Sequence, residues 1–295
     1  MIVTLKSSLL TVEIDDFGAQ MSSVKDTAGT EYIWQADPAI WARHAPTLFP
    51  VIARLQDGQY THKGQTYSIT SHGFARDNRF QVVESSGTHA VFRLTENEKT
   101  LAMYPFPFRL TISYRLEGTC LTKTTTVENP GAEEMPYELG NHDGFRIPLN
   151  EGEVMEDYAV ILPGVDTLTP YGMDENLMTT PKSKVYPLTN GRIPVKPMSV
   201  GVDTFLLDEL PQRQAHLVDK NGKVRVTLKF EDFPYLGIWT KPMPLDFDTN
   251  YVCIEPWTTL PDATFVGRGL VDKQGIRILA PGASETFSYT TEFFE

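Results

Sequence analysis

The stretch Phe108-Arg-Leu-Thr-Ile-Ser-Tyr-Arg-Leu116 alternates apolar and polar side chains without a break. Successive side chains of an extended strand point to opposite faces, so the apolar residues would line one face and the polar residues the other. The pattern therefore predicts a strand with one face in the core. The stretch Val224-Arg-Val-Thr-Leu-Lys-Phe230 repeats the alternation and predicts a second strand of the same kind.

Short strands account for much of the remaining chain. Weaker alternation occurs at 10–14, 81–83, 90–94, 121–127 and 284–294, and 21 Gly and 21 Pro residues punctuate these runs. No long window has the 3.6-residue period of a helix, so we expect an all-β protein, an antiparallel sandwich or barrel. The proline-rich stretch from Pro163 to Pro197 could link two domains, but the strands on both sides look alike, so we expect a single domain over residues 1–295 with a long excursion inside it. Such excursions are often functional or cover a site.

Charge and composition exclude several classes of protein. The chain has 26 Lys and Arg against 38 Asp and Glu, so its formal net charge is 26 − 38 = −12. Nucleic acids and anionic membranes require a basic face, and we expect neither as a partner. We see no secretory signal, no apolar run near the ~20 residues of a membrane helix, and only two cysteines, far apart. These features predict a reduced, cytoplasmic protein.

The familiar cofactor and metal motifs are missing. The chain contains no GxGxxG, GxxxxGK[ST] or GxSxG, and none of its six histidines lies in HxH or HExxH. We therefore expect no nucleotide cofactor and no metal site. We therefore expect either catalysis by side chains alone or binding of a ligand without catalysis.

Two candidate site residues lie in the first third of the chain. Arg54 has apolar neighbours, and its guanidinium could bind oxygen-rich groups of a ligand or pair with a nearby carboxylate such as Asp57. His72 precedes Gly73, whose backbone freedom would allow a ligand to approach closely. The alternative for His72 is a turn histidine bonded to backbone.

A third candidate, His142, lies between Gly140 and Gly144. The neighbouring Asp143 could hold the imidazole in one tautomer or keep it partly protonated near neutral pH. A histidine of that kind suits a general acid. A polar turn between strands is the alternative for this segment.

The stretch Tyr251-Val-Cys-Ile-Glu-Pro-Trp257 would place Glu255 and Trp257 on one face of a strand. Loss of water around Glu255 would raise its pKa and make it a stronger base, and a carboxylate beside tryptophan is suited to holding a sugar. The alternative is a buried glutamate paired with an arginine. Asp203 could accept hydrogen bonds from vicinal hydroxyls, or could cap a turn.

Together these segments resemble the aldose 1-epimerase (galactose mutarotase) superfamily, and most closely its LacX-like branch. Four stretches carry the resemblance in the family's order: Leu48-Phe-Pro…Ala-Arg-Leu-Gln-Asp-Gly58, His72-Gly-Phe-Ala-Arg-Asp77, Gly140-Asn-His-Asp-Gly-Phe145 and Cys253-Ile-Glu-Pro-Trp257. Residues 31–34 and 104–108 also match that branch, so the resemblance extends over nearly the whole chain.

The resemblance implies a β-supersandwich that interconverts the α and β anomers of a free aldose, glucose-like or galactose-like, without a cofactor, as a monomer or homodimer. By position in the motifs, Glu255 matches the catalytic base, His142 the general acid and His72 the histidine near the ring oxygen and C1. The matched substrate-binding residues are Arg54, Asp203 and, in the branch's own motif, Arg76, with Trp257 beside the base.

Some positions depart from the family pattern. Asn141 and Asp143 flank the second histidine, where the branch has a small residue and proline, and Thr258 and Thr259 follow Glu-Pro-Trp in place of an aromatic residue and glycine. Ala53 replaces the asparagine that accompanies the arginine. These changes keep the acid and base and bear on substrate preference.

Mutarotation requires a base for the anomeric hydroxyl proton and an acid for the ring oxygen, and the candidate residues supply both.

Three other functions fit parts of the pattern. A hexose-6-phosphate 1-epimerase would use basic residues such as Arg54, Arg76 and Arg79. A glycoside hydrolase would need a second carboxylate, Asp203 or Asp262, near Glu255. A non-catalytic sugar-binding or sensory module would need only the binding residues.

Overall fold

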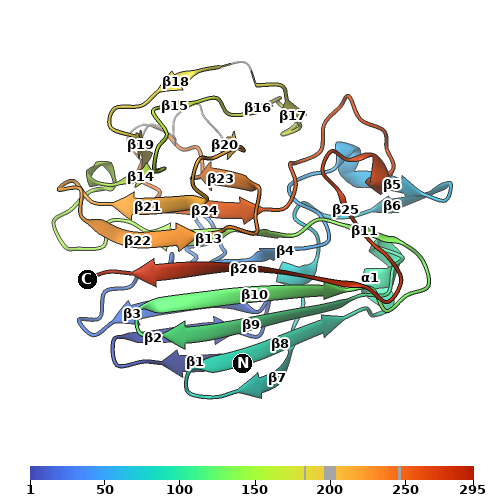
Figure 1. The fold of residues 1–295 in the computed structure, drawn as a ribbon, viewed down its shortest axis with the longest axis horizontal. Coiled ribbons are helices and arrows are strands. Elements are labelled where there is room, and N and C mark those ends of the chain that lie inside the picture. The colour runs from blue at the N-terminus through green and yellow to red at the C-terminus, as the bar shows by residue number, and fades with distance from the viewer. Residues whose placement is uncertain (183, 196–203, 245–246) are drawn as a thin grey trace.

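The computed structural model describes residues 1–182, 184–195, 204–244 and 247–295. Over these residues the chain is built almost entirely from antiparallel strands (Figure 1). The prediction of an all-β antiparallel sandwich is therefore confirmed. None of the helices in these ranges combines the length and the apolar character needed to cross a membrane.

The largest sheet has nine strands in the order β19-β14-β21-β22-β26-β10-β9-β8-β7. Its strands are β7 (Gln81–Ser85), β8 (His89–Thr95), β9 (Arg109–Glu117), β10 (Cys120–Glu128), β14 (Ala159–Ile161), β19 (Arg192–Pro194), β21 (Gln214–Val218), β22 (Val224–Lys229) and β26 (Ser284–Phe293).

The stretch that predicted the fold forms β9. Its apolar residues are at most 2% exposed, and they point into the core as the alternation requires: Leu110, Ile112, Tyr114 and Leu116. The strand predicted at 224–230 is β22, but there the polar face is also covered. Arg225 and Thr227 are buried, and each has a hydrogen-bond partner. Arg225 donates to the Phe294 carbonyl, and the His216 ring contacts Thr227 Oγ1.

A six-stranded sheet carries His142 and Glu255, the two predicted acid–base residues. It runs β20-β23-β24-β12-β4, and β13 also pairs with β24. Its strands are β4 (Thr47–Leu48), β12 (Gly140–Asn141), β13 (Asp143–Arg146), β20 (Thr204–Leu207), β23 (Tyr235–Trp239) and β24 (Tyr251–Trp257). All seven residues of β24 are buried, as expected for the central strand of a covered sheet.

The two large sheets face each other across a core that contains polar groups. Lys123 on β10 donates to Thr47 on β4 over 2.8 Å, and Tyr289 on β26 donates to Asp143 on β13 over 2.5 Å. Burial lowers the pKa of Lys123 to about 8 and raises that of Asp143 to about 6. Buried polar side chains need such partners, so these bonds fix how the sheets stack.

Smaller elements complete the fold. A three-stranded sheet contains β1 (Ile2–Lys6), β2 (Leu10–Asp15) and β3 (Gln20–Asp26). The two-stranded pairs are β5 (Gln59–His62) with β6 (Gln65–Ser68), β11 (Met135–Tyr137) with β25 (Arg277–Leu279), β15 (Thr167–Leu168) with β18 (Tyr186–Pro187), and β16 (Gly172–Met173) with β17 (Thr179–Thr180). The described helices are α1 (Glu98–Met103) and the short 3₁₀ turns at Gln56–Gly58, Ala75–Asp77, Met155–Asp157 and Leu270–Asp272.

The described part of the proline-rich excursion forms the hairpins β15–β18 and β16–β17. Figure 1 shows them along the upper edge of the molecule, beyond β20 and β23. Met173, at the end of β16, and Leu177 line a cavity on this side of the six-stranded sheet. Two residues of the excursion therefore contribute to the wall of this cavity.

Candidate active site

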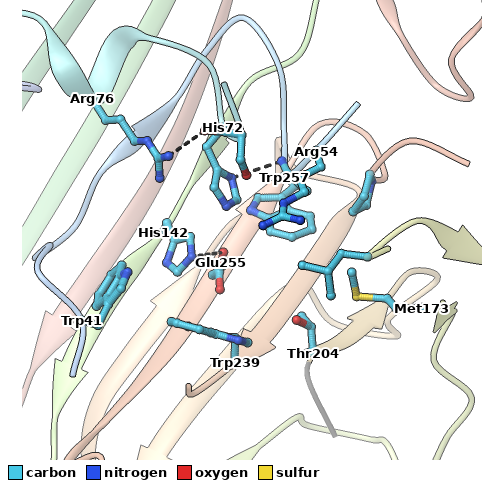
Figure 2. Close-up of a pocket in the computed structure, with 14 residues that line it drawn as sticks. Trp41, Arg54, His72, Arg76, His142, Met173, Thr204, Trp239, Glu255 and Trp257 are labelled. Atoms are coloured by element: carbon cyan, nitrogen blue, oxygen red, sulfur yellow. Dashed lines mark hydrogen bonds and ion pairs between the residues drawn. The ribbon is translucent and has the colours of Figure 1, made fainter. Parts of the chain in front are cut away.

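A cavity of about 240 Å³ lies over the face of β24 that carries Glu255. Figure 2 shows side chains from the first, second and last thirds of the chain converging on it. The lining residues are Trp41, Ala53, Arg54, Ser71, His72, Arg76, His142, Met173, Leu177, Thr204, Trp239, Glu255, Trp257 and Pro261. Six of the seven predicted site residues are among them, although they are distant in sequence.

Glu255 and His142 meet at the bottom of this cavity. β13 pairs with β24 so that Asp143 lies opposite Ile254, which brings the preceding His142 beside Glu255. His142 Nε2 lies 3.3 Å from Glu255 Oε2, and the two residues are only 6% and 1% exposed. A carboxylate and an imidazole in contact at the base of a cavity can exchange protons with one small ligand.

Tryptophan rings hold the imidazole from two sides. The Trp41 ring stacks on the His142 ring at 4.9 Å, and the Trp239 ring meets it edge-on at 5.4 Å. Gly144 makes this packing possible, because a Cβ there would lie 2.7 Å from the Trp41 ring. The rings exclude water from the imidazole and leave little freedom for it to rotate (Figure 2).

The surroundings hold His142 in its neutral form. Burial, followed by the positive charges of Arg76 and Arg43, lowers the pKa of His142 to about 3. The expectation of a partly protonated imidazole near neutral pH is therefore wrong. Because Nδ1 has no hydrogen-bond partner in the described part of the chain, we assign the proton to Nε2, which faces Glu255.

Asp143 does not act on the imidazole as the sequence suggested. Neighbouring residues of a strand point to opposite faces, so the Asp143 carboxyl enters the core and binds Tyr289 instead. The carboxylate beside His142 is that of Glu255, which is more than a hundred residues away in sequence.

His72 contacts backbone and also lines the cavity. The two roles considered for it, a turn histidine and a residue that contacts a ligand, are therefore compatible. Its Nδ1 accepts a hydrogen bond from Ala53 N at 3.1 Å, and its own backbone N donates to Ala53 O at 2.7 Å. Nδ1 must therefore be unprotonated, which leaves the proton on Nε2. Burial, and then the charges of His142 and Arg76, lowers the pKa of His72 well below its usual value.

The backbone around His72 adopts sterically restricted conformations. Ala53 and His72 have φ of 51° and 65°, which non-glycine residues seldom adopt. Gly73 packs so closely that a Cβ would lie 2.2 Å from the Phe49 carbonyl oxygen. Such conformations persist where the surrounding structure fixes them, and they concentrate at functional sites.

Two of the three predicted basic residues line the cavity. Arg54 lines the cavity and forms no ion pair with Asp57, which accepts from Arg268 at 2.6 Å instead. Arg76 donates to the Ser71 carbonyl at 2.6 Å, and burial lowers the pKa of its guanidinium to about 10. Arg79 is an exposed residue that pairs with Asp16 and does not line the cavity.

The threonines that depart from the family pattern support the wall of the site. Trp257 Nε1 donates to the Asn141 carbonyl at 3.2 Å, which fixes the ring beside the cavity. Thr258 Oγ1 accepts from Leu139 N, and Thr259 donates to the buried Glu138. They therefore act in the scaffold behind Trp257.

The two other predicted carboxylates are Asp203 and Asp262. Asp203 lies outside the described residues. Asp262 accepts from Gln56 N and Ala263 N at 3.0 and 2.9 Å, so it stabilises a turn and does not line the cavity. Among the described lining residues Glu255 is the only carboxylate, whereas a glycoside hydrolase needs two.

The sequence reading missed other parts of the site. Trp41 lies in an irregular segment with no motif, and Met173 and Leu177 belong to short hairpins, so no local pattern marked them. Cys253 also lies near the bottom of the cavity. In the described part of the chain, His142, Cys253 and Glu255 form a group whose potential metal-ligand atoms lie within 4.8 Å of one another.

The site can now be compared with known proteins. A family model described as aldose 1-epimerase matches residues 1–277. This chain belongs to the aldose 1-epimerase family. The chromosomal and plasmid LacX proteins of Lactococcus lactis subsp. lactis are 30% identical to it over 297 residues, covering 98% of each chain, which confirms the resemblance to LacX.

Solved structures of similar proteins agree with the family. A galactose mutarotase related enzyme from Lactobacillus acidophilus superposes with a TM-score of 0.93 at 32% identity, covering 100% of this chain and 98% of the other. A galactose mutarotase-like protein from Lactobacillus casei superposes with a TM-score of 0.89 at 27% identity over 100% of both chains. Both solved structures therefore share this fold over almost their full length.

Proposed function

We propose that this protein is a mutarotase that interconverts the α and β anomers of a free hexose, with Glu255 and His142 as the acid–base pair. The observation that supports this most directly is the 3.3 Å contact between the Glu255 carboxylate and His142 Nε2 at the bottom of a small cavity. A cyclic aldose has two oxygens on C1, the anomeric O1 and the ring O5. Neighbouring proton-exchanging groups suit oxygens that share one carbon.

In the reaction we propose, the Glu255 carboxylate takes the O1 proton while the C1–O5 bond breaks, and His142 Nε2 gives its proton to O5. C1 becomes an aldehyde carbon and turns about the C1–C2 bond, and the reverse steps close the ring to the other anomer. Because Nε2 and Oε2 are in contact, the proton taken by Glu255 can return to His142, so the pair needs no net charge change. A neutral histidine can act as an electrophile in this way when its pKa is lowered.

The remaining lining residues have supporting roles in this proposal. His72 presents Nε2–H to the ring oxygen region, and Arg54 and Arg76 bind sugar hydroxyls. Trp257 and Trp239 supply apolar surface for the sugar ring. We propose Asp203 as a further hydroxyl acceptor on the strength of the family motif alone.

The wider setting of the protein follows from the same proposal. We propose one catalytic domain over residues 1–295, acting without a cofactor as a monomer or homodimer. A cytoplasmic setting is consistent with the two cysteines, Cys120 and Cys253, being free thiols.

Polarimetry on freshly dissolved α-glucose and α-galactose tests the activity. We expect the protein to accelerate the approach to anomeric equilibrium, and to act less well on glucose 6-phosphate than on glucose. Faster turnover of the phosphosugar would favour a hexose-6-phosphate epimerase. Calorimetric binding of a hexose without any acceleration would instead identify a sugar-binding module and overturn the proposal.

A further inference from the structure

We infer that the bottom of the cavity is also a binding site for Zn²⁺, formed by His142, Cys253 and Glu255, and that zinc bound there inhibits the enzyme by occupying its acid–base pair. This inference goes beyond the proposed function. The metal binding stands independently of that function, whereas the inhibition rests on it.

Strand pairing assembles the three ligands. Cys253 and Glu255 alternate along β24 and therefore share a face, and β13 places Gly144 opposite Cys253, two residues from His142. One ring nitrogen of His142, Cys253 Sγ and a Glu255 carboxylate oxygen lie within 4.8 Å of one another. Sequence spacing gave no sign of this group, because strand pairing and not a short motif brings the ligands together.

The donor set matches the preferences of zinc. Imidazole nitrogen, thiolate sulfur and carboxylate oxygen are its usual ligands, at about 2.0–2.3 Å in a tetrahedral arrangement. Such bond lengths place ligand atoms roughly 3.3–3.8 Å apart. Nε2 and Oε2 already have that spacing at 3.3 Å, so the main adjustment is a small movement of the Cys253 side chain.

Charge also favours a divalent cation here. A thiolate, a carboxylate and a neutral imidazole carry two negative charges, which Zn²⁺ cancels, and burying a neutral complex avoids the penalty of burying a net charge. The metal replaces the thiol proton of Cys253, which leaves to solvent, and His142 binds through Nε2 as the tautomer that carries its proton on Nδ1.

Three protein ligands leave the fourth tetrahedral position to a water molecule on the side of the cavity. Both members of the acid–base pair would then be metal ligands, so neither could exchange protons with a hexose. Zinc and aldose are therefore expected to compete for the free enzyme.

The two cysteines of the chain provide a matched pair of variants. Cys120 lies on β10 in the other large sheet and has no part in the cluster. Titration with Cd²⁺, whose bonds to thiolates absorb in the ultraviolet, reports metal binding without any measurement of activity. We expect one equivalent of the cadmium–thiolate band in the wild type and in Cys120→Ser, and none in Cys253→Ser or Cys253→Ala.

The affinity of the metal provides a second readout. Loss of an outer-shell partner typically weakens metal binding by about 10–100-fold, so loss of a direct ligand should weaken it at least tenfold. We expect this in Glu255→Gln by Zn²⁺ competition against Cd²⁺. A cadmium band that survives in both Cys253 variants, or is absent from the wild type, would overturn the inference even if mutarotation is observed.

The inhibition is then measured by polarimetry, with each variant compared with its own rate in the presence of a chelator. We expect Zn²⁺ to raise the apparent KM of the wild type and Cys120→Ser, and to act at least tenfold less strongly on Cys253→Ser. If zinc binds as described but inhibits both variants equally, the proposed inhibition is wrong.

Discussion

Two buried carboxylates in this molecule have opposite roles. Glu138 and Glu255 are 0% and 1% exposed, so burial does not distinguish them. Glu138 is enclosed by donors: Ile52 N at 2.7 Å, Thr259 Oγ1 at 2.9 Å and Lys273 Nζ at 3.2 Å. Glu255 contacts His142 and faces a cavity. A buried carboxylate surrounded by fixed donors stabilises a fold, whereas one facing a cavity beside a proton-exchanging group can do chemistry.

The position of Glu138 explains what that cluster stabilises. It binds the backbone of Ile52, next to Ala53, whose amide in turn binds the His72 ring. The Glu138 cluster therefore holds the turn that positions His72 and Arg54. Each carboxylate can be changed to glutamine, which preserves shape and removes charge, so the comparison can be tested directly.

The largest expected effect is that of Glu255→Gln. The amide cannot take the O1 proton, and acid–base assistance is worth about 10²–10⁴-fold, so we expect kcat to fall by that factor. The variant should remain folded and bind sugar with little change in affinity. Polarimetry and calorimetry on the same preparation measure both quantities, and wild-type turnover would contradict the assignment.

His142→Gln tests the partner of Glu255. We expect a loss of about 10²-fold or more in kcat, because the ring oxygen no longer receives a proton. Removal of both groups should cost far less than the product of the single losses, since they act as a unit. Losses that multiply in the double variant would show that the two groups act separately.

Glu138→Gln should affect stability before chemistry. Removal of one member of a buried ion pair leaves Lys273 without its counter-charge, and such changes cost about 3–5 kcal/mol. Chemical denaturation measures the free energy of unfolding, and Glu138→Gln/Lys273→Met should recover part of the loss. A Glu138→Gln protein of unchanged stability and strongly reduced kcat would reverse the roles assigned to the two glutamates.

The smallest expected effect concerns the loss of stability between pH 6.5 and 5. The folded state keeps His142 and His72 neutral well below their unfolded pKa, so in this window the unfolded state binds more protons. Stability therefore falls as pH falls in this window, by up to about 1.4 kcal/mol per pH unit for each histidine.

The raised pKa of Asp143, about 6, acts in the opposite direction below pH 6, because there the folded state binds the extra proton. Comparison of wild type with His142→Gln isolates the histidine. We expect the variant to lose less stability between pH 6.5 and 5 in urea denaturation. Equal losses in the two proteins would show that His142 titrates normally in the folded state.

The fold was predictable where one physical rule dominates. In β9 one face is buried, so its residues alternate between apolar and polar and the strand could be predicted. The four family motifs contain most of the predicted residues that line the cavity. What failed was inference from neighbours in sequence. Asp143 is adjacent to His142, but the alternation of side chains along the strand directs its carboxyl to Tyr289. Asp57 is close to Arg54 in sequence, but it accepts a hydrogen bond from Arg268.

Other features could not be predicted because they arise only from contacts between segments that are distant in sequence. Trp41 reaches His142 from a segment without periodicity, and Cys253 becomes a potential ligand only when β13 lies beside β24. The lowered pKa of His142 likewise depends on burial and on Arg76, which no local motif encodes. The predicted role of Asp203 stays a prediction.

The most direct test of the central claim is a crystal structure of the protein soaked with a hexose. The account predicts that O1 lies within hydrogen-bond distance of the Glu255 carboxylate and that the ring oxygen lies within the same distance of His142 Nε2. A hexose bound in this cavity with C1 turned toward the opening, and with Glu255 contacting only hydroxyls of C3 or C4, would contradict it.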